Sequence, residues 1–421
     1  MTMLTRTFAA ALFATAGFAA QAETVTLDVQ WPYGNFFKDT FDQIKEQFEA
    51  ENPDIKINYR TPYEEYEQAT QMVLREAITD SMPDVSFQGL NRLRILVDRE
   101  IAQSLDPFIE AEADFDKDGY HKAMMDLTTI NDGTYGIPFA VSLPLVYYNM
   151  DLVEAAGGSA DDLPETWDEV IDLARKINAL EGDAHGMWFG WSVTGNWMWQ
   201  ALVFSQEGTM LDPEEREVAF GGPEGEWAID QIARFVNETD MPNLAYKESP
   251  QVFSAGRVGM FVWSSSQLVN IGNTVGDKFT MKTGPFPNMK EAGGLPSGGN
   301  TVVMLAKDPE RQAAAWKFIK FATSGRGAAV VARTTGYLPP NTEANRVYLA
   351  DFYETSPNHL PAVDQLPKMT GWYAFPGKNG LKITQVIYDN LESIVTRQRN
   401  EEPQAVLGDM VSEVQGLLPR D

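Results

Sequence analysis

The 421-residue sequence contains no cysteine, and only three of its residues are histidines. Without cysteine the chain forms no disulfide, and it lacks the residue that would carry the anchor of a lipoprotein. His121, His185 and His359 lie far apart and belong to no local motif, so core or solvent-exposed histidines explain them better than catalysis. The H-E-x-x-H, Walker A, G-x-G-x-x-G and G-x-S-x-G motifs are also missing. The sequence therefore predicts no catalytic residue, no metal and no cofactor, and we expect a protein that is not an enzyme.

Basic residues are scarce. The chain has 33 Lys and Arg against 60 Asp and Glu, which gives a net charge of −27. Such a surface repels nucleic acid and anionic lipid, so neither is expected as a partner. Beyond the N-terminus there is no long apolar run that could span a bilayer. Charges are mixed along the chain and 43% of the residues are hydrophobic, which indicates a folded globular protein.

The N-terminus holds the longest apolar run. Arg6 precedes an apolar segment from Phe8 to Ala20, and Ala20-Gln21-Ala22 supplies the small-x-small pattern of a cleavage site. These three parts predict a signal peptide over residues 1–22, with cleavage before Glu23. The apolar segment is too short for a membrane anchor. We therefore expect export to a periplasm, without a lipoprotein anchor and without insertion into the membrane.

Strand and helix patterns alternate after residue 23. Residues 24–31 alternate apolar and polar side chains and predict a strand, and further strands are predicted at 55–59 and 84–87. Between the first two, four apolar side chains recur at helical spacing, namely Phe37, Phe41, Ile44 and Phe48. Strands separated by helices indicate parallel βαβ units, which bind ligands beyond the carboxyl ends of their strands.

A second α/β region follows a β-rich segment at residues 135–148. Pro138 and Pro144 in this segment favour a crossing between two lobes, and further strands are predicted at 258–263 and 300–305. The chain shows neither an internal repeat nor a low-complexity linker. Two lobes joined by short crossings are therefore expected.

One acidic segment has the spacing of a calcium loop. Asp114, Asp116, Asp118 and Gly119 match positions one, three, five and six of an EF-hand. Position twelve, which should be a bidentate glutamate, falls on Met125. An exposed acidic turn explains the segment better, and no metal site is predicted.

Tryptophans gather in two places. One short segment holds four of them, Trp188, Trp191, Trp197 and Trp199, and Trp263 directly precedes three serines. The CH faces of a sugar pack well on an indole, while its hydroxyls need polar partners nearby. Core packing is expected to account for at least half of these tryptophans. The others indicate a carbohydrate-binding site.

Six segments carry a resemblance to a known family. In chain order they are FEAENPDIKINY, MPDVSF, GIPFAVSLPLVYYNMDLVEAAG, PETWDEVIDLARKI, FSAGRVGMFVWSSS and AAAWKFIKFATSGRGAAVVARTTGYLPPN. Their order and spacing resemble the periplasmic solute-binding proteins of carbohydrate ABC importers (extracellular solute-binding protein family 1). Within that family the similarity is to the branch that contains the glycerol-3-phosphate-binding protein.

The resemblance implies a fold and a set of partners. The fold would be two α/β lobes of the type II, maltose-binding-protein-like class, joined by a hinge and closing on a ligand between them. Lobe 1 would hold residues 23–138 and 300–338, and lobe 2 residues 139–299 and 339–421. The protein would be a monomer that delivers its ligand to ABC permease subunits served by a separate ATPase.

The resemblance also implies ligand contacts in both lobes. The candidate ligand-binding residues are Tyr33, Tyr66, Gln88, Asn91, Ser142, Trp191, Trp263, Ser264, Gly299, Asn300, Tyr337 and Lys382. Trp191 would form an aromatic floor, and Gly299 would let a backbone N–H approach the ligand without interference from a Cβ. Purely structural roles stay open for Gly299 and Tyr337, as do turn or cap roles for Ser142 and Ser264.

Two positions depart from the phosphate-binding branch. Where that branch has an acidic contact after its third strand, this chain offers Gln88 or Asn91. Where it has an arginine in a Gly-Leu-Arg segment, this chain has Lys382, which lacks the bidentate guanidinium. We therefore expect a small neutral sugar, polyol or glycoside. Glycerol-3-phosphate or another phosphorylated or sulfonated polyol is the alternative, and a secreted glycoside hydrolase or lyase is the alternative of another class.

Overall fold

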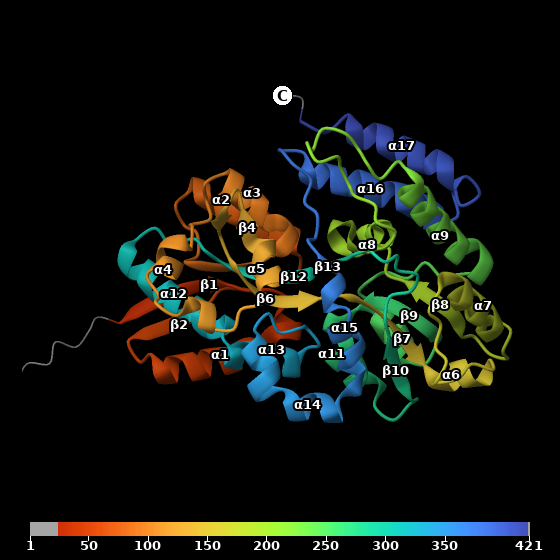
Figure 1. Cartoon of the computed structure of the whole chain (residues 1–421), viewed down its shortest axis with the longest axis horizontal. Helices are drawn as coiled ribbons and strands as arrows, with labels where there is room; N and C mark the ends of the chain where they lie inside the picture. The colour runs from red at the N-terminus through yellow and green to blue at the C-terminus, as the bar shows by residue number, and fades with distance from the viewer. Residues whose placement is uncertain (1–23, 420–421) are drawn as a thin grey trace, which may run out of the picture.

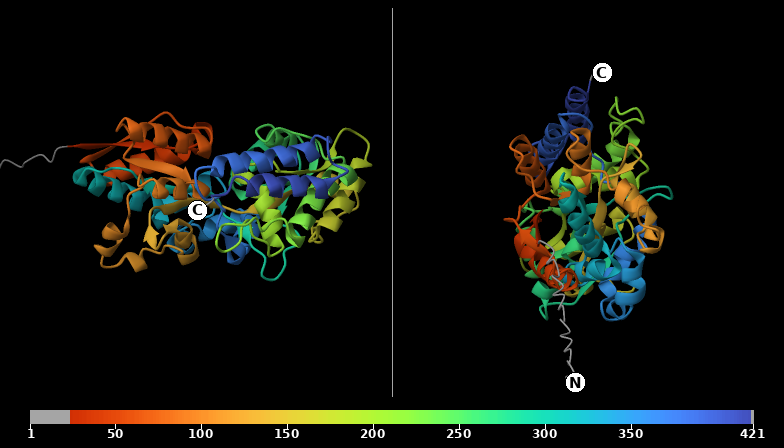
Figure 2. Two further views of the ribbon diagram at one scale, coloured as in Figure 1. Left: turned by 90° about the horizontal axis from the view of Figure 1, so that it is seen from above. Right: turned by 90° about the vertical axis from the view of Figure 1, so that its left-hand side faces the viewer.

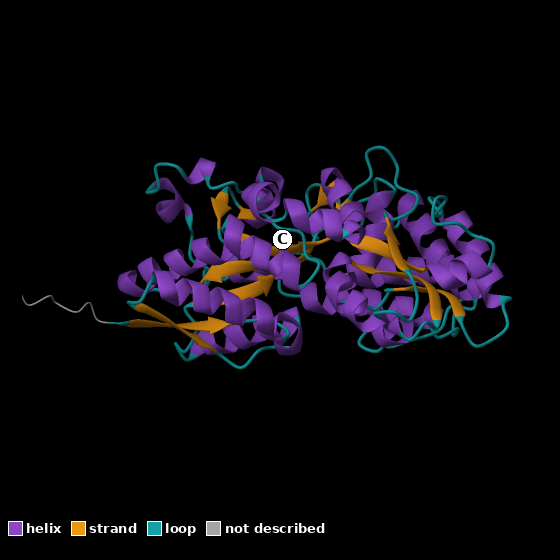
Figure 3. Cartoon of the chain, turned by 90° about the horizontal axis from the view of Figure 1, so that it is seen from below, coloured by secondary structure: helices purple, strands orange, loops and turns teal. Residues whose placement is uncertain are grey.

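The computed structural model describes residues 24–419, which form two α/β units side by side along the long axis of the molecule (Figures 1 and 2). The signal peptide predicted for residues 1–22 lies outside the described residues. Each unit is built on its own sheet, and helices surround the strands of both (Figure 3). None of the helices in residues 24–419 is long and apolar enough to cross a membrane.

The first unit contains a five-stranded sheet in the order β2-β1-β3-β12-β6. Its strands are β1 (Val25–Gln30), β2 (Ile55–Tyr59), β3 (Val85–Gly89), β6 (Ile137–Ser142) and β12 (Gly298–Met304). Strand β1 pairs in parallel with β2 and β3, whereas β12 runs antiparallel to both β3 and β6. The sheet is therefore completed by a strand that comes from much later in the chain.

The helices of the first unit are α1 (Gly34–Glu51), α2 (Tyr66–Ile78), α3 (Leu93–Asp98), α4 (Asp106–Glu110), α5 (Lys122–Met125), α12 (Pro309–Thr323) and α13 (Gly325–Thr334). The longer helices bury apolar side chains against the core of this unit, whereas α4 has no fully buried residue. The stripe predicted from Phe37 to Phe48 is buried on α1, at the spacing that places side chains on one helix face. A small ribbon of β4 (Thr129–Ile130) and β5 (Gly133–Thr134) completes this unit.

The second unit contains a four-stranded sheet in the order β10-β7-β9-β8. Its strands are β7 (Pro144–Asn149), β8 (His185–Phe189), β9 (Val258–Ser264) and β10 (Met281–Gly284). Its helices are α6 (Met150–Ala155), α7 (Trp167–Asn178), α8 (Trp197–Ser205), α9 (Pro223–Thr239), α10 (Ser249–Ser254), α11 (Leu268–Val275), α16 (Gly380–Val395) and α17 (Pro403–Gln415). A two-stranded sheet of β11 (Leu295–Pro296) and β13 (Met369–Thr370) lies beside α8.

The first passage of the chain between the units is very short. Only Leu143 separates β6 of the first sheet from β7 of the second. The chain returns to the first sheet between β10 and β12, and the backbone N–H of Leu338 then donates to the Val141 carbonyl. The crossing at Leu143 matches the predicted short crossings, while the exact lobe boundaries stay a prediction.

The segment after residue 338 stays beside the first unit for some distance. Helix α14 (Ala350–Thr355) and the turn before it pack on α13, with Ala328 and Leu349 in one small apolar cluster. Helix α15 (Leu360–Asp364) then leads towards the second sheet, where Gln365 donates to the Pro144 carbonyl. The last two helices, α16 and α17, pack on α9.

Candidate ligand-binding site between the two units

A cavity of about 170 Å³, called the inner cavity below, lies where the two units meet. The first unit contributes Tyr33, Phe36, Glu65, Tyr66, Ser142, Gly298, Gly299 and Tyr337 to its wall. The second contributes Val193, Thr194, Trp197, Tyr246, Trp263, Ser264, Ser266, Gln267 and Trp372. Many of these residues follow the carboxyl ends of strands: Tyr33 follows β1, while Ser142 and Ser264 end β6 and β9. The cavity therefore lies at the sheet edge where α/β folds bind ligands.

Aromatic rings form most of this wall. Tyr33 and Tyr66 meet edge to face with their centroids 5.3 Å apart, and Tyr246 stacks on Trp263 at 6.1 Å. The ring of Tyr66 also meets the ring of Trp372 edge to face, with their centroids 6.4 Å apart. Rings from both units therefore contact each other here. Rings at these different angles offer flat apolar faces to a ligand, as the CH faces of a sugar require.

Hydroxyl groups of both units lie along the same wall. The Asn300 amide donates to the Tyr66 hydroxyl at 3.1 Å, and Ser264 Oγ donates to Ser266 Oγ at 2.8 Å. Burial raises the pKa of the Tyr337 phenol, whereas its hydrogen bonds with Tyr66 and Ser266 lower that pKa. Burial also holds the pKa of Tyr66 well above its usual range. Both phenols stay neutral and can donate to or accept from the hydroxyls of a ligand.

Gly299 has a structural reason to be glycine, and it also lines the cavity. Its φ is +111°, a conformation that side chains rarely adopt, and the pairing of β12 with β6 shifts register shortly after it, between Asn300 and Thr301. A Cβ at this position would lie 1.9 Å from the Ala140 carbonyl oxygen. The tight approach of β12 to β6 thus excludes any larger residue.

Only one charged side chain, Glu65, is among the lining residues named above, and no lysine or arginine is. Burial is the largest effect on its carboxyl and raises its pKa, while a hydrogen bond from the Tyr246 hydroxyl lowers it. Lys247 Nζ lies 3.4 Å from the same carboxylate but is itself largely exposed. An anionic ligand would therefore find no cationic side chain in the wall to pair with.

Seven of the predicted residues line the inner cavity: Tyr33, Tyr66, Ser142, Trp263, Ser264, Gly299 and Tyr337. An eighth, Asn300, is fully buried behind Tyr66 and orients its hydroxyl. Their role as ligand contacts stays a prediction, but the fold brings them together from six separate segments.

Three predicted polar residues do not line the inner cavity. Gln88 accepts from Thr70 at 2.9 Å and donates to Ser86 at 2.7 Å, so its amide is bonded inside the first unit. Asn91 lies in the short turn after β3 and is buried against Gly195. Lys382 is exposed on the first turn of α16.

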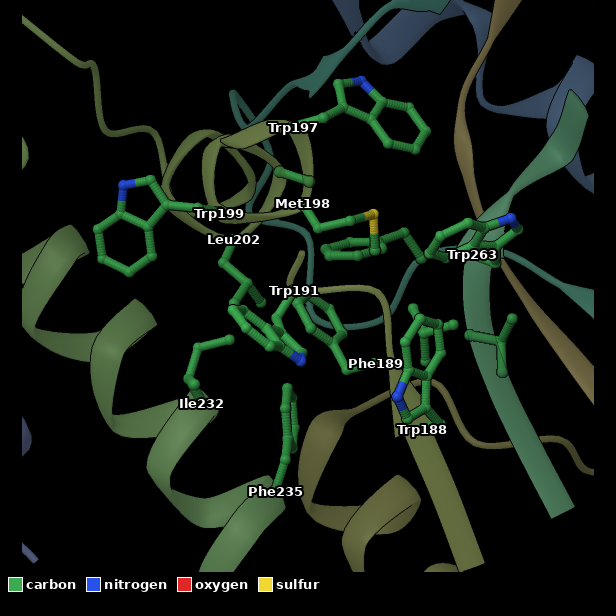
Figure 4. Close-up of a cluster of buried hydrophobic side chains, with 14 of the residues drawn as sticks. Trp188, Phe189, Trp191, Trp197, Met198, Trp199, Leu202, Ile232, Phe235 and Trp263 are labelled. Atoms are coloured by element: carbon green, nitrogen blue, oxygen red, sulfur yellow. The ribbon is translucent and has the colours of Figure 1, made fainter. Parts of the chain in front are cut away.

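The tryptophan cluster divides between core and cavity. Trp191 is 3% exposed and packs on Tyr388 of α16, so it does not line the cavity, and Trp188 and Trp199 are fully buried (Figure 4). Trp197, at the start of α8, reaches the cavity, where its indole N–H donates to the Pro296 carbonyl at 2.8 Å.

Several lining residues had no signal of their own in the sequence. Phe36 and Glu65 stand among ordinary helix-forming residues, and Tyr246 and Trp372 come from irregular segments. Trp197 did belong to the tryptophan cluster that the sequence singled out, so composition pointed to the right segment without identifying the residue.

The acidic turn at Asp114 is paired with lysines. Asp114 bonds to Lys117, and Asp118 lies 3.2 Å from Lys320 Nζ. Among residues 24–419 there is no group of three or more acidic or histidine side chains placed to hold a metal ion. The turn therefore has the form of an exposed, lysine-paired loop.

The chain is similar to known proteins over most of its length. Residues 43–362 match the family model described as bacterial extracellular solute-binding protein. The sn-glycerol-3-phosphate-binding periplasmic protein UgpB of Escherichia coli K12 is 28% identical over 400 residues, covering 90% of this chain and 89% of that protein.

Solved structures of similar fold cover nearly the whole chain. UgpB from Mycobacterium tuberculosis, in complex with glycerophosphocholine, has a TM-score of 0.83 at 20% identity and covers 94% of this chain and 98% of its own. Maltose-bound MalE3 of T. maritima has a TM-score of 0.79 at 20% identity and covers 94% and 100%. These likenesses confirm the predicted two-lobed, maltose-binding-protein-like α/β fold. With its family match over most of the sequence, the chain belongs to the bacterial extracellular solute-binding proteins.

Proposed function

We propose that this chain is the exported substrate-binding component of an ABC-type carbohydrate importer. It captures a small sugar, polyol or glycoside in the inner cavity and delivers it to the membrane permease. The observation that carries the proposal is a wall of aromatic faces and oriented hydroxyls at the junction of two hinged units. Aromatic faces bind the CH surface of a sugar, and fixed hydroxyls satisfy its polar groups.

The charge of the wall supports a neutral ligand over a phosphorylated one. The similar protein of E. coli is named for glycerol-3-phosphate, which a phosphate-binding site would pair with basic side chains. Among the described residues that line the cavity here, only Glu65 is charged, and Lys382 lies on the surface of α16. Burying a phosphate beside a carboxylate without a cationic partner is strongly unfavourable. Glycerol-3-phosphate or a related polyol phosphate is therefore the second candidate.

Capture would proceed by closure of the two units around the ligand. The crossing at Leu143 between β6 and β7 would be one of the hinge segments about which the units bend. Polar contacts between the units would hold the closed form, which the permease subunits would recognise, with the ATPase on a separate chain. We propose a periplasmic monomer, exported by its signal peptide, that binds its ligand without turning it over.

A ligand screen tests this proposal directly. Residues 23–421 would be melted in the presence of neutral sugars, polyols and glycosides, and of glycerol-3-phosphate and glycerophosphocholine. A ligand present at a hundred times its Kd adds about 2.7 kcal/mol to the free energy of unfolding, so a raised Tm is expected for a neutral compound. A rise with the phosphate compounds alone would refute the neutral ligand. Release of reducing sugar from an oligosaccharide or glycoside would instead identify a hydrolase.

A further inference from the structure

A second and larger cavity adjoins the inner one. This outer cavity has a volume of about 760 Å³ and also lies between the units, with Arg94 and Leu127 on one side and Met210 and Glu215 on the other. Within the described part of the chain, Trp372 is the one residue that belongs to both walls. Its indole therefore stands between two spaces that differ more than fourfold in volume.

The backbone around Trp372 is held firmly although it forms no helix or strand. Trp372 follows shortly after β13, and β13 lies at the junction of the two units in Figure 1. Gln200 of α8 is fully buried, accepts from the Tyr373 N–H at 2.9 Å and donates to the Tyr373 carbonyl at 3.2 Å. The same amide donates to the Gly195 carbonyl at 3.2 Å, which ties this segment to the start of α8.

The indole itself is fixed in one place. Its N–H donates to the Gly195 carbonyl at 3.1 Å, and its ring centroid lies 6.4 Å from both Tyr66 and Trp197. Gly195 has a φ of +65°, and a Cβ there would lie 2.6 Å from Trp372 Cζ2. The ring thus occupies the space between an aromatic residue of each unit and is only 6% exposed.

We propose that Trp372 sets the length of the ligand by separating the inner cavity from the outer one, which restricts binding to a single sugar or polyol unit. This inference rests on the proposed function. Without the indole the two cavities would form one continuous groove. The outer part of that groove offers what further sugar units need: the faces of Phe204 and Tyr373, and hydrogen-bonding groups on Arg94, Asp212 and Glu215.

The test compares ligand lengths in matched variants. Wild type and Trp372→Ala would be titrated calorimetrically with glucose, galactose, mannose and xylose, and with the di- and trisaccharides of each. We expect wild type to bind at least one single-unit sugar and to bind its trisaccharide at least a hundredfold more weakly. In Trp372→Ala that ratio should fall at least tenfold, mainly because the trisaccharide binds more tightly.

Two further variants test whether the separation of the two cavities by Trp372, and no other effect of the substitution, sets the preferred ligand length. Gly195→Ala displaces the ring without removing it and should shift the preference in the same direction, which covers the case that Trp372→Ala does not fold. Phe204→Ala enlarges the outer cavity alone and should leave the preference unchanged. Equal wild-type affinity for one and three units, or an unchanged ratio in both Trp372→Ala and Gly195→Ala, would overturn the inference. A folded wild type that binds none of these sugars and none of the polyols and glycosides of the screen would instead refute the proposed function, and the inference with it.

Discussion

A bidentate ion pair between Arg94 and Glu215 joins the two units beside the outer cavity. Arg94 Nη1 and Nη2 lie 2.7 and 2.8 Å from the two carboxylate oxygens of Glu215, and the Tyr373 hydroxyl donates to the same carboxylate at 2.9 Å. Tyr373 and Glu215 belong to the same unit, so Arg94→Gln leaves their bond in place. It removes the looser contact of Arg94 Nε with Asp98, 3.7 Å away on the same helix, and the bond between units. Because this bond can exist only when the units approach each other, its loss should act on closure.

The expected effect is modest and can be worked out from the geometry. The two side chains are 35% and 29% exposed, so solvent screens the pair, and such bonds are typically worth at most about 1 kcal/mol. The bidentate arrangement favours the upper end of that range. A loss of about 1 kcal/mol shifts the ratio of closed to open molecules about fivefold. If ligand is held in the closed form, the apparent Kd rises by the same factor.

Calorimetry with the ligand found in the screen measures this Kd, and small-angle scattering with and without ligand measures closure. Arg175→Gln is the matched control, because Arg175 pairs with Glu238 inside the second unit. It should leave the Kd within twofold of wild type. Raising the salt concentration should weaken binding in wild type more than in Arg94→Gln, since only wild type has the pair to screen.

The pH dependence offers an independent check on the same pair. The hydrogen bond from Arg94 is the largest effect on Glu215 and helps to lower its pKa below the ordinary 4.5. A lowered carboxyl pKa contributes its stabilisation above about pH 4.5 and loses it as the pH falls through the lowered value. Closure in wild type should therefore weaken at acid pH more than in Arg94→Gln. Equal Kd, equal scattering and equal pH profiles in the two proteins would refute the reasoning.

Three further expectations concern single residues. Trp263→Ala should weaken ligand binding at least tenfold, because its ring lines the cavity, whereas the core variant Trp191→Ala should mainly cost stability, about 3–5 kcal/mol by urea unfolding. Gly299→Ala should lower the free energy of unfolding by about 3 kcal/mol or more, because its Cβ would meet the Ala140 carbonyl oxygen. Gly157 also has a positive φ, +85°, but a Cβ there would have nothing within 4 Å. Gly157→Ala should therefore lower the free energy of unfolding by only about 1 kcal/mol. Burial lowers the pKa of His359 below 6.5, so the unfolded state binds more protons just below that pH. When the pH falls from 7.5 to 5.5, the Tm of wild type should therefore fall further than the Tm of His359→Gln.

Local patterns in the sequence were sufficient to predict α1 and several of the strands. The stripe from Phe37 to Phe48 predicted α1 because a single helix face buries it, which depends only on spacing along the chain. Alternating strands and helices likewise predicted the parallel pairing of β1 with β2 and β3. The antiparallel position of β12 between β3 and β6 depends on contacts between distant segments, and no local pattern encodes it.

The site was predicted less evenly, for physical reasons. Resemblance pointed to Tyr66 and Ser264, which lie at ends of regular elements, where spacing along the chain determines position. It could not separate Trp191 from Trp197, because one helical turn and one loop decide which indole faces the core. Trp372 comes from an irregular segment whose place is set by hydrogen bonds to Gln200, far away in sequence.

The position of β12 has a consequence for the order of folding. Until residues 298–304 are available, β3 and β6 have no strand between them, and the first sheet has two unpaired edges at its centre. A chain interrupted before residue 298 therefore holds an incomplete first unit, and the pairing that completes it spans more than two hundred residues. Such long-range pairing is slow to form. The first unit of a nascent chain would thus stay incomplete until residue 304 has been made, although the strands of the second sheet are all available before then.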